Sequence, residues 1–188
     1  MTLFPIQLPY SWSEAHGSKL TSVSKAAKDW ITTESSLTIR IKELGISFSL
    51  EVLNQSTLEL DSTLQQTLST KDTSALFREV LLKQANTPLI YAQTIMPIST
   101  VTGTEKMLSE LGDQPLGQVL FQSPQAIRGA IEFSEVHQNS ALGCYIQQHL
   151  LQSIQQKTYI RRSQFLLNNK PLLVCECFLP ELFTYQPC

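Results

Sequence analysis

The C-terminal part of the chain holds two apolar segments that only a very short connection separates. Residues 159–167 and 171–179 are each long enough for a strand, and the Asn-Asn pair at 168–169 is typical of a tight hairpin turn. A second pair of strand-like segments, residues 75–82 and 88–97, is joined by five residues. Antiparallel strands can be joined this closely, whereas parallel strands need a long crossover. The sequence therefore predicts an antiparallel sheet.

The rest of the chain predicts short helices and two further strands. Helical spacing, caps or stop signals indicate helices over residues 24–31, 35–45 (with Gly45 as its stop), 102–111, 115–121 and 141–155. The Thr-Gly-Thr-Glu sequence at 102–105 reads as a capping box.

Strict alternation over residues 46–52 predicts a strand with one wet face, and residues 129–133 predict a weaker one. Residues 54–73 are polar and rich in turn-forming residues. The fold class that follows is α+β, a single antiparallel β-sheet flanked by short helices. We expect a loose N-terminal arm over residues 1–23 and one domain over residues 24–188.

Charge and composition exclude several classes of protein. The 188 residues carry a net charge of -2, which does not provide the broad basic surface of a nucleic-acid-binding protein. No apolar run approaches the ~18 residues of a spanning helix, so we expect no membrane insertion. Residues 1–18 contain no Lys or Arg, unlike the start of a signal peptide, and the four cysteines have no zinc-binding spacing. We therefore expect reduced thiols and a cytoplasmic location.

Two charged residues stand in apolar strand segments. Arg78 shares its predicted strand face with Leu76, Val80 and Leu82, and Glu176 is surrounded by apolar residues on both faces of its strand. An unpaired buried charge costs several kcal/mol, and arginine cannot escape this cost by losing its proton. Two interpretations are open: Arg78 forms a structural ion pair with Glu176 or with Glu79, or Arg78 and Glu176 line a closed pocket that binds a carboxylate ligand.

Other signs of chemistry are few. The three histidines lack metal-ligand spacing, and no phosphate-binding loop, GxSxG or HExxH motif occurs. Cys175 has no basic neighbour in its strand to activate it, which favours a packing role. We expect neither a metal nor a cofactor, so any reaction must rely on positioning and electrostatics.

Several sequence blocks, in this order along the chain, resemble the chorismate pyruvate-lyase family. They are Leu-Phe-Arg-Glu-Val-Leu-Leu (76–82), Thr-Ile-Met-Pro-Ile-Ser-Thr (94–100), Leu-Gly-Asp-Gln-Pro-Leu-Gly-Gln-Val-Leu-Phe (111–121), Arg-Arg-Ser (161–163), Lys-Pro-Leu-Leu (170–173) and Glu-Cys-Phe-Leu-Pro (176–180). The resemblance extends from Trp30 to Pro180.

The resemblance implies an antiparallel sheet whose ligand is enclosed beneath helical flaps. It also implies conversion of chorismate to 4-hydroxybenzoate and pyruvate, the first committed step of ubiquinone synthesis, without a cofactor. Arg78 would hold the ring carboxylate and Glu176 the ring hydroxyl. Main-chain groups at Leu116 and, on weaker sequence similarity, at Leu37 would complete the substrate site.

Two departures from the family pattern raise questions. Gln93 stands where we expect an arginine, and its loss would weaken binding of the second carboxylate of chorismate unless Arg161 or Arg162 replaces it. Residues 137–156 are longer than the expected connection, which we interpret as a surface insertion rather than an elaboration over the site.

A second function belongs to a different class. Similar α+β domains serve as ligand sensors in transcription regulators, where an Arg/Glu pocket would bind a small aromatic acid without reacting. This chain has no basic helix-turn-helix segment, which favours the enzyme. We expect a monomer whose partners are chorismate and 4-hydroxybenzoate.

Overall fold

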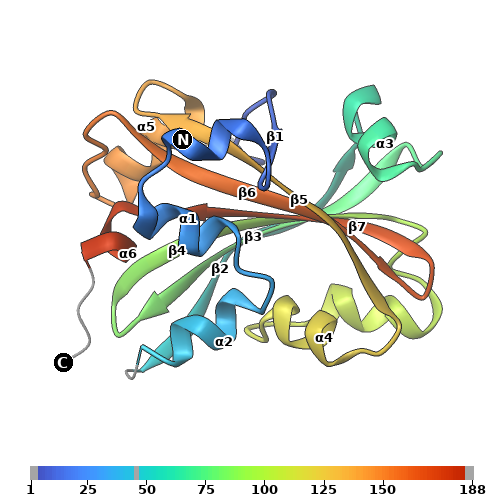
Figure 1. Cartoon of the computed structure of the whole chain (residues 1–188). Coiled ribbons are helices and arrows are strands. Elements are labelled where there is room, and N and C mark those ends of the chain that lie inside the picture. The colour runs from blue at the N-terminus through green and yellow to red at the C-terminus, as the bar shows by residue number, and fades with distance from the viewer. Residues whose placement is uncertain (1–3, 45–46, 185–188) are drawn as a thin grey trace.

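A computed structural model describes residues 4–44 and 47–184 of the chain. Seven strands form one antiparallel sheet in the order β1-β5-β6-β7-β4-β3-β2 (Figure 1). The strands are β1 (Ser13–Glu14), β2 (Phe48–Glu59), β3 (Ser74–Gln84), β4 (Thr87–Pro97), β5 (Ala126–His137), β6 (Lys157–Leu167) and β7 (Lys170–Phe178). The helices are η1 (Ser18–Ser22), α1 (Lys25–Ile31), α2 (Leu37–Lys42), α3 (Ser62–Leu68), η2 (Gly103–Glu110), α4 (Leu116–Gln122), α5 (Ala141–His149) and α6 (Pro180–Thr184). The predicted fold class is confirmed.

Both predicted hairpins are present, β3–β4 and β6–β7. Asn168 and Asn169 have φ angles of 50° and 62°, the left-handed conformation that a two-residue hairpin turn requires and that asparagine tolerates. The turn chemistry therefore fixes the register of β6 against β7, and this register decides which residues face each other across the site.

Several predicted boundaries were wrong. Residues 54–73 are not a turn-rich loop: β2 continues to Glu59, and α3 follows, with the side chain of Asp61 accepting a hydrogen bond from the Leu64 N–H. β2 is an edge strand, so many of its residues are polar and face solvent. For this reason the sequence did not show how far the strand extends. β5 spans twelve residues rather than five, and α5 ends at His149 rather than near residue 155.

The predicted capping box does not form. The helix after Thr102 is a 3₁₀ helix without a side-chain cap, because the Glu105 carboxylate instead accepts hydrogen bonds from Lys170 and Asn168. Gly45 and Ile46, where we expected a helix to stop and a strand to begin, lie outside the described residues.

The expected loose arm is packed against the sheet over the residues described, 4–23. β1 pairs with β5, and Ile6, Ala15 and Val23 are buried. The Ile6 N–H donates to the buried Glu79 carboxylate over 2.7 Å. Apolar burial and this hydrogen bond together hold the segment in place. Its sequence has no helical or strand periodicity, so this packing could not be predicted.

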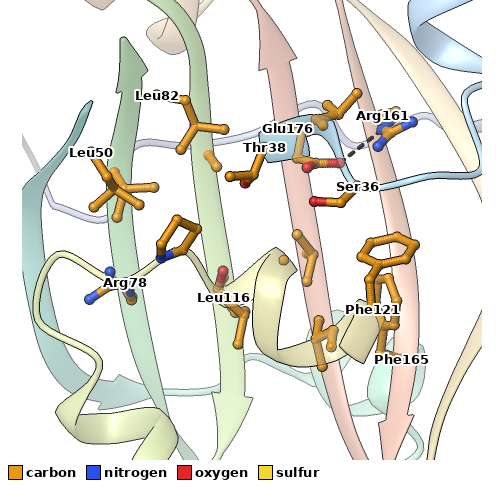
Figure 2. A pocket seen from close by; sticks show the side chains of 18 of the residues that line it. Ser36, Thr38, Leu50, Arg78, Leu82, Leu116, Phe121, Arg161, Phe165 and Glu176 are labelled. Carbon is orange, nitrogen blue, oxygen red and sulfur yellow. Dashed lines mark hydrogen bonds and ion pairs between the residues drawn. The ribbon is translucent and has the colours of Figure 1, made fainter. Parts of the chain in front are cut away.

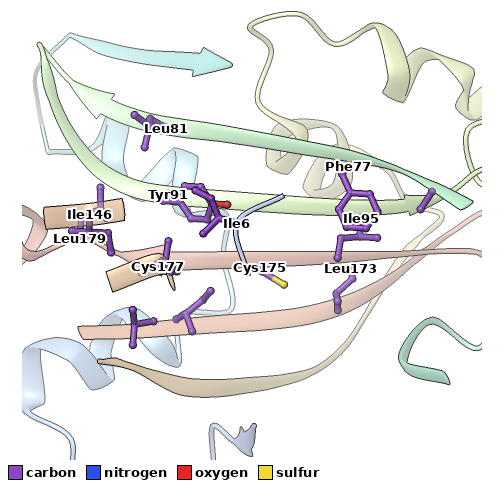
Figure 3. Packing of buried hydrophobic residues seen from close by; sticks show 14 of the residues in the cluster. Ile6, Phe77, Leu81, Tyr91, Ile95, Ile146, Leu173, Cys175, Cys177 and Leu179 are labelled. Atoms are coloured by element: carbon purple, nitrogen blue, oxygen red, sulfur yellow. The ribbon is translucent and has the colours of Figure 1, made fainter. Parts of the chain in front are cut away.

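The two faces of the sheet carry different cores. One face packs α3, α5 and the N-terminal segment over a continuous apolar cluster that includes Phe77, Tyr91 and Cys175 (Figure 3). The other face carries two separate clusters, one beneath α1 and α2 and one beneath η2 and α4. Polar residues occupy the gap between these two clusters, and the candidate site lies there.

Candidate active site

A narrow cavity of about 40 Å³ lies between the sheet and the helices α2 and α4 (Figure 2). α2 and α4 are far apart in sequence but adjacent in space, and together they cover the cavity. Arg78, Glu176, Leu37 and Leu116, the four residues predicted from the sequence, all line it. Their roles remain predictions, but the structure brings all four to one place.

Arg78 on β3 is 2% exposed and has no carboxylate within 4.0 Å in the part of the chain that the structure describes. Its guanidinium donates instead to Gln55 Oε1 (3.1 Å) and to the carbonyl oxygens of Gly112 (2.8 Å) and Gln114 (3.3 Å). Burial lowers the pKa of Arg78, and Asp113 partly offsets this. The expected structural pair with Glu176 or Glu79 is therefore wrong. A buried cation without a counter-ion is costly, which makes Arg78 a candidate for binding an anion.

Glu176 on β7 is paired with Arg161, its direct neighbour on β6. Arg161 Nε donates to Glu176 Oε2 over 2.8 Å, and Arg161 Nη1 donates to the carbonyl oxygens of Trp30, Ile31 and Thr33. The Arg161 side chain is 1% exposed and that of Glu176 is 16% exposed. The arginine thus fixes the carboxylate, which still reaches the cavity (Figure 2).

Leu37 and Leu116 are the first residues of α2 and α4. The first N–H groups of a helix have no partner within the helix, so these positions present main-chain donors to whatever lies beside them. Ser36 and Pro115, which precede them, provide no side-chain cap.

Four further polar residues line the cavity without having been predicted as site residues: Ser36, Thr38, Thr94 and Arg128. The Ser36 Oγ atom is buried and has no hydrogen-bond partner among the described residues. Arg128 lies on β5, one residue before the predicted segment 129–133. Ala126 and Ile127 before it are both apolar, so no alternation marks the strand at this point of the sequence.

Gln93 and Arg162 do not belong to this site. Gln93 lies on the opposite face of the sheet, where its Nε2 donates to Ile6 O (2.9 Å) and to Glu79 Oε1 (3.0 Å). Arg162 is on the same face and pairs with Glu132. The hypothesis that the residue at position 93 contacts the second carboxylate is therefore wrong, because adjacent residues of a strand point to opposite faces.

Cys175 and Cys177 belong to the apolar cluster on the other face of the sheet (Figure 3). Burial raises the pKa of Cys175 to about 12 and raises that of Cys177. Neither thiol is poised to become a nucleophilic thiolate.

In residues 4–44 and 47–184, no three His, Cys, Asp or Glu side chains gather as metal ligands would, and no helix is both long and apolar enough to cross a bilayer.

Comparison with known proteins identifies the family. The family model described as chorismate lyase matches residues 10–187. The chain is 38% identical over 185 residues to a probable chorismate pyruvate-lyase of Pseudoalteromonas translucida, covering 98% of this chain and 100% of that one. It is 31% identical to a chorismate pyruvate-lyase of Escherichia coli, covering 81% of each chain. The chain belongs to the chorismate lyase family.

Solved structures with the same fold come from transcription regulators. A GntR-family regulator of Bacillus cereus matches with a TM-score of 0.54 and 14% identity, over 75% of this chain and 97% of that one. The effector domain of PhnF from Mycobacterium smegmatis matches with a TM-score of 0.53 and 12% identity, over 78% of this chain and 90% of that one. At this level of identity the likeness establishes the fold alone.

Proposed function

We propose that the cavity beneath α2 and α4 is where this chorismate pyruvate-lyase converts chorismate to 4-hydroxybenzoate and pyruvate. In this proposal Arg78 binds the ring carboxylate, and Glu176 accepts a hydrogen bond from the C4 hydroxyl. The observation that carries the assignment is a buried arginine with no carboxylate partner at one end of a cavity and a carboxylate at the other end.

The spacing of these two residues suits a ring with para substituents. Arg78 is opposite Thr94 on β4, Thr94 is opposite Val174 on β7, and Glu176 is two residues further along. Strand spacing and rise place the two Cα atoms about 12 Å apart. Both side chains line the same cavity, with Thr38 and Leu116 between them in the view of Figure 2.

The reaction needs no external oxidant or reductant. The C3–O bond breaks, the C4 proton is lost, and the enolpyruvyl methylene gains a proton to become the methyl group of pyruvate, while the ring becomes aromatic. The hydrogen can pass from C4 to the methylene within the substrate. Orientation can contribute roughly 7–11 kcal/mol, whereas acid–base assistance is typically worth ~10²–10⁴-fold, so positioning is the larger contribution.

The cavity must open to admit its substrate. An engineered apolar cavity that binds benzene measures about 150 Å³, and the narrow cavity here measures about 40 Å³. Separation of α2 from α4 would enlarge it without disturbing the sheet. A ligand enclosed on all sides would leave slowly, since release requires the same motion.

We also propose that the enzyme acts as a cytoplasmic monomer without a cofactor. One chain supplies every group assigned here to the substrate, so the site requires no second subunit. Light scattering of the active enzyme tests this, and activity found only in an oligomeric fraction would contradict it.

The experiment that tests the function is to mix the purified protein with chorismate in the presence of a chelator and to follow both products. Equimolar 4-hydroxybenzoate and pyruvate, abolished by Arg78→Ala, is the expected result. Tight binding of 4-hydroxybenzoate without turnover would instead support the sensor-like alternative.

A further inference from the structure

The cavity carries more positive charge than one carboxylate needs. The charged residues that line it are Arg78, Arg128, Arg161 and Glu176, which sum to +2. Under the proposed function, on which this inference rests, the substrate has two carboxylates, whereas the aromatic product has one. The excess charge therefore matches the substrate, and Arg78 can account for only one of the two anionic groups.

The chemistry of chorismate defines where the second carboxylate lies. The enolpyruvyl group is attached to C3, next to the carbon that carries the hydroxyl. With the hydroxyl at Glu176, the side chain of the substrate must extend from that end of the cavity, away from Arg78. Arg161 is at this end, but its charge is already paired with the Glu176 carboxylate at 2.8 Å, and its Nη1 donates to three carbonyl oxygens.

Arg128 is the other cation at this end. Its Nε donates to Ser163 Oγ (3.0 Å), and its Nη1 donates to the carbonyl oxygens of Glu34 (3.0 Å) and Thr33 (3.4 Å). Thr33 also accepts from Arg161, so the two guanidinium groups lie beside one another. Among the described residues, no carboxylate lies within 4.0 Å of Arg128. No described residue accepts a hydrogen bond from the Nη2 group of Arg128.

Arg128 stands at the boundary between the narrow cavity and the exterior. With Phe121, it lines both the cavity and an adjoining open hollow. Burial and the neighbouring Arg161 charge lower the pKa of Arg128 to about 10, so the group remains protonated at neutral pH. Two adjacent, partly buried cations repel each other, and an anion placed between them and the ring would offset that cost.

Ser36 supplies a second, independent sign of a ligand. The residue is 1% exposed, its Oγ has no partner in the described part of the chain, and it does not cap α2 although it stands at the N-cap position. Figure 2 shows Ser36 beside the Glu176–Arg161 pair. Buried hydroxyl groups are nearly always hydrogen-bonded, so a group left unsatisfied at a cavity wall marks a contact that the ligand completes.

We propose that Arg128, assisted by the Ser36 hydroxyl, binds the enolpyruvyl carboxylate of chorismate. Arg128 is thereby a specificity-determining residue: it recognises the substrate but makes no charged contact with 4-hydroxybenzoate. The product loses this contact when pyruvate departs, while its ring carboxylate stays on Arg78.

The test compares substrate and product binding in matched variants. Arg128→Gln should weaken chorismate binding, measured from the concentration dependence of single-turnover rates, by about 10–150-fold, the range for a lost hydrogen bond to a charged group. The dissociation constant of 4-hydroxybenzoate, measured by calorimetric titration, should change less than threefold. Ser36→Ala should show the same selectivity with a smaller loss, and Arg128→Lys should recover part of the chorismate affinity.

Two controls separate this inference from the proposed function. Arg162→Gln, on the other face of the sheet, should alter neither affinity, and Arg78→Gln should weaken both. If Arg78→Gln weakens both ligands but Arg128→Gln and Ser36→Ala weaken substrate and product equally, the subsite is wrong while the proposed function stands. If Arg78→Gln affects neither ligand, the proposed function itself fails. Should Arg128→Gln not fold, as judged by thermal melting, the lysine and Ser36→Ala variants decide the question.

Discussion

Arg161 lies directly opposite Glu176 on neighbouring strands and donates its Nε hydrogen to the carboxylate over 2.8 Å. This pair explains how an acidic side chain is held within an apolar strand. It also restricts what the acid can do, since one of its oxygens is already engaged by a cation.

Replacing Glu176 tests whether its negative charge takes part in proton transfer. We expect Glu176→Gln to reduce kcat by less than about 100-fold, because the amide oxygen still accepts from Arg161 and the amide NH2 group can donate to the oxygen of the C4 hydroxyl. Single-turnover rates of 4-hydroxybenzoate formation provide the measurement. A loss of 10³-fold or more, with unchanged substrate binding, would assign proton transfer to the carboxylate.

Enclosure of the cavity by α2 and α4 predicts slow product release. Rapid mixing of enzyme with excess chorismate should give a burst of about one 4-hydroxybenzoate per active site, followed by a slower steady rate. Adding 4-hydroxybenzoate before mixing should abolish the burst. A linear time course from the first turnover would show that opening is not rate-limiting.

Gln93 provides a prediction from the opposite face of the sheet. We expect Gln93→Arg to change the KM for chorismate by less than about twofold, since position 93 faces Glu79 and the N-terminal segment rather than the cavity. Its effect should appear in the melting temperature, because the substitution replaces the buried hydrogen bonds that Gln93 Nε2 donates to Ile6, Glu79 and Tyr91. Steady-state kinetics and thermal melts on the same preparation measure both effects. A marked fall in the KM for chorismate would contradict the placement of position 93 away from the cavity.

The stability of the protein should depend on Glu105 at low pH. Hydrogen bonds from Lys170 (2.6 Å), Thr104 (2.7 Å) and Asn168 (2.6 Å) lower the pKa of Glu105 to about 2, below the ordinary value of about 4.3. Because the folded state lowers this pKa, the stabilisation is complete above about pH 4–5 and is lost as the pH falls towards 2.

Urea unfolding between pH 2.5 and pH 7 measures this contribution. The stability of Glu105→Gln should fall less steeply than that of the wild type across the acid range. Glu110→Gln is the matched control, since Glu110 pairs only with exposed Lys106 at 3.7 Å. Identical acid dependence of the wild type and Glu105→Gln would refute the assignment.

Sequence patterns predicted the central hairpins because the apolar strand segments and the short connections between them indicate the same structure. The apolar strands and the Asn168-Asn169 turn each specify β6–β7 without help from distant residues. The second half of β2 and the start of β5 were missed because β2 is an edge strand and β1 covers only Glu132 and Phe133 of β5, so neither stretch carries the continuous apolar pattern of a central strand. Their register comes from pairing, which a single sequence does not display.

Only part of the candidate site could be predicted, because some of its residues are unusual in their local sequence and others are not. Arg78 and Glu176 stand out because each is a charge in an apolar strand. The partner of Glu176 could not be identified, since Arg161 becomes its neighbour only through the β6–β7 register. Ser36 and Arg128 gave no signal, because a serine before a helix and an arginine beside a turn are ordinary surface features. Only the tertiary fold turns them towards the cavity.

Arg78 and Glu79 are consecutive residues that serve opposite faces of β3, one at the cavity and the other bonded to Ile6, Tyr91 and Gln93. Alternate residues of this strand are therefore under different constraints. Positions 78 and 80 line the cavity, while Phe77 and Glu79 on the other face contact the N-terminal segment through the core cluster and a hydrogen bond to Ile6. A descendant that lost its substrate would be free to change Arg78, whereas Val80 and Leu82 on the same face would still be required for the core beneath α1 and α2.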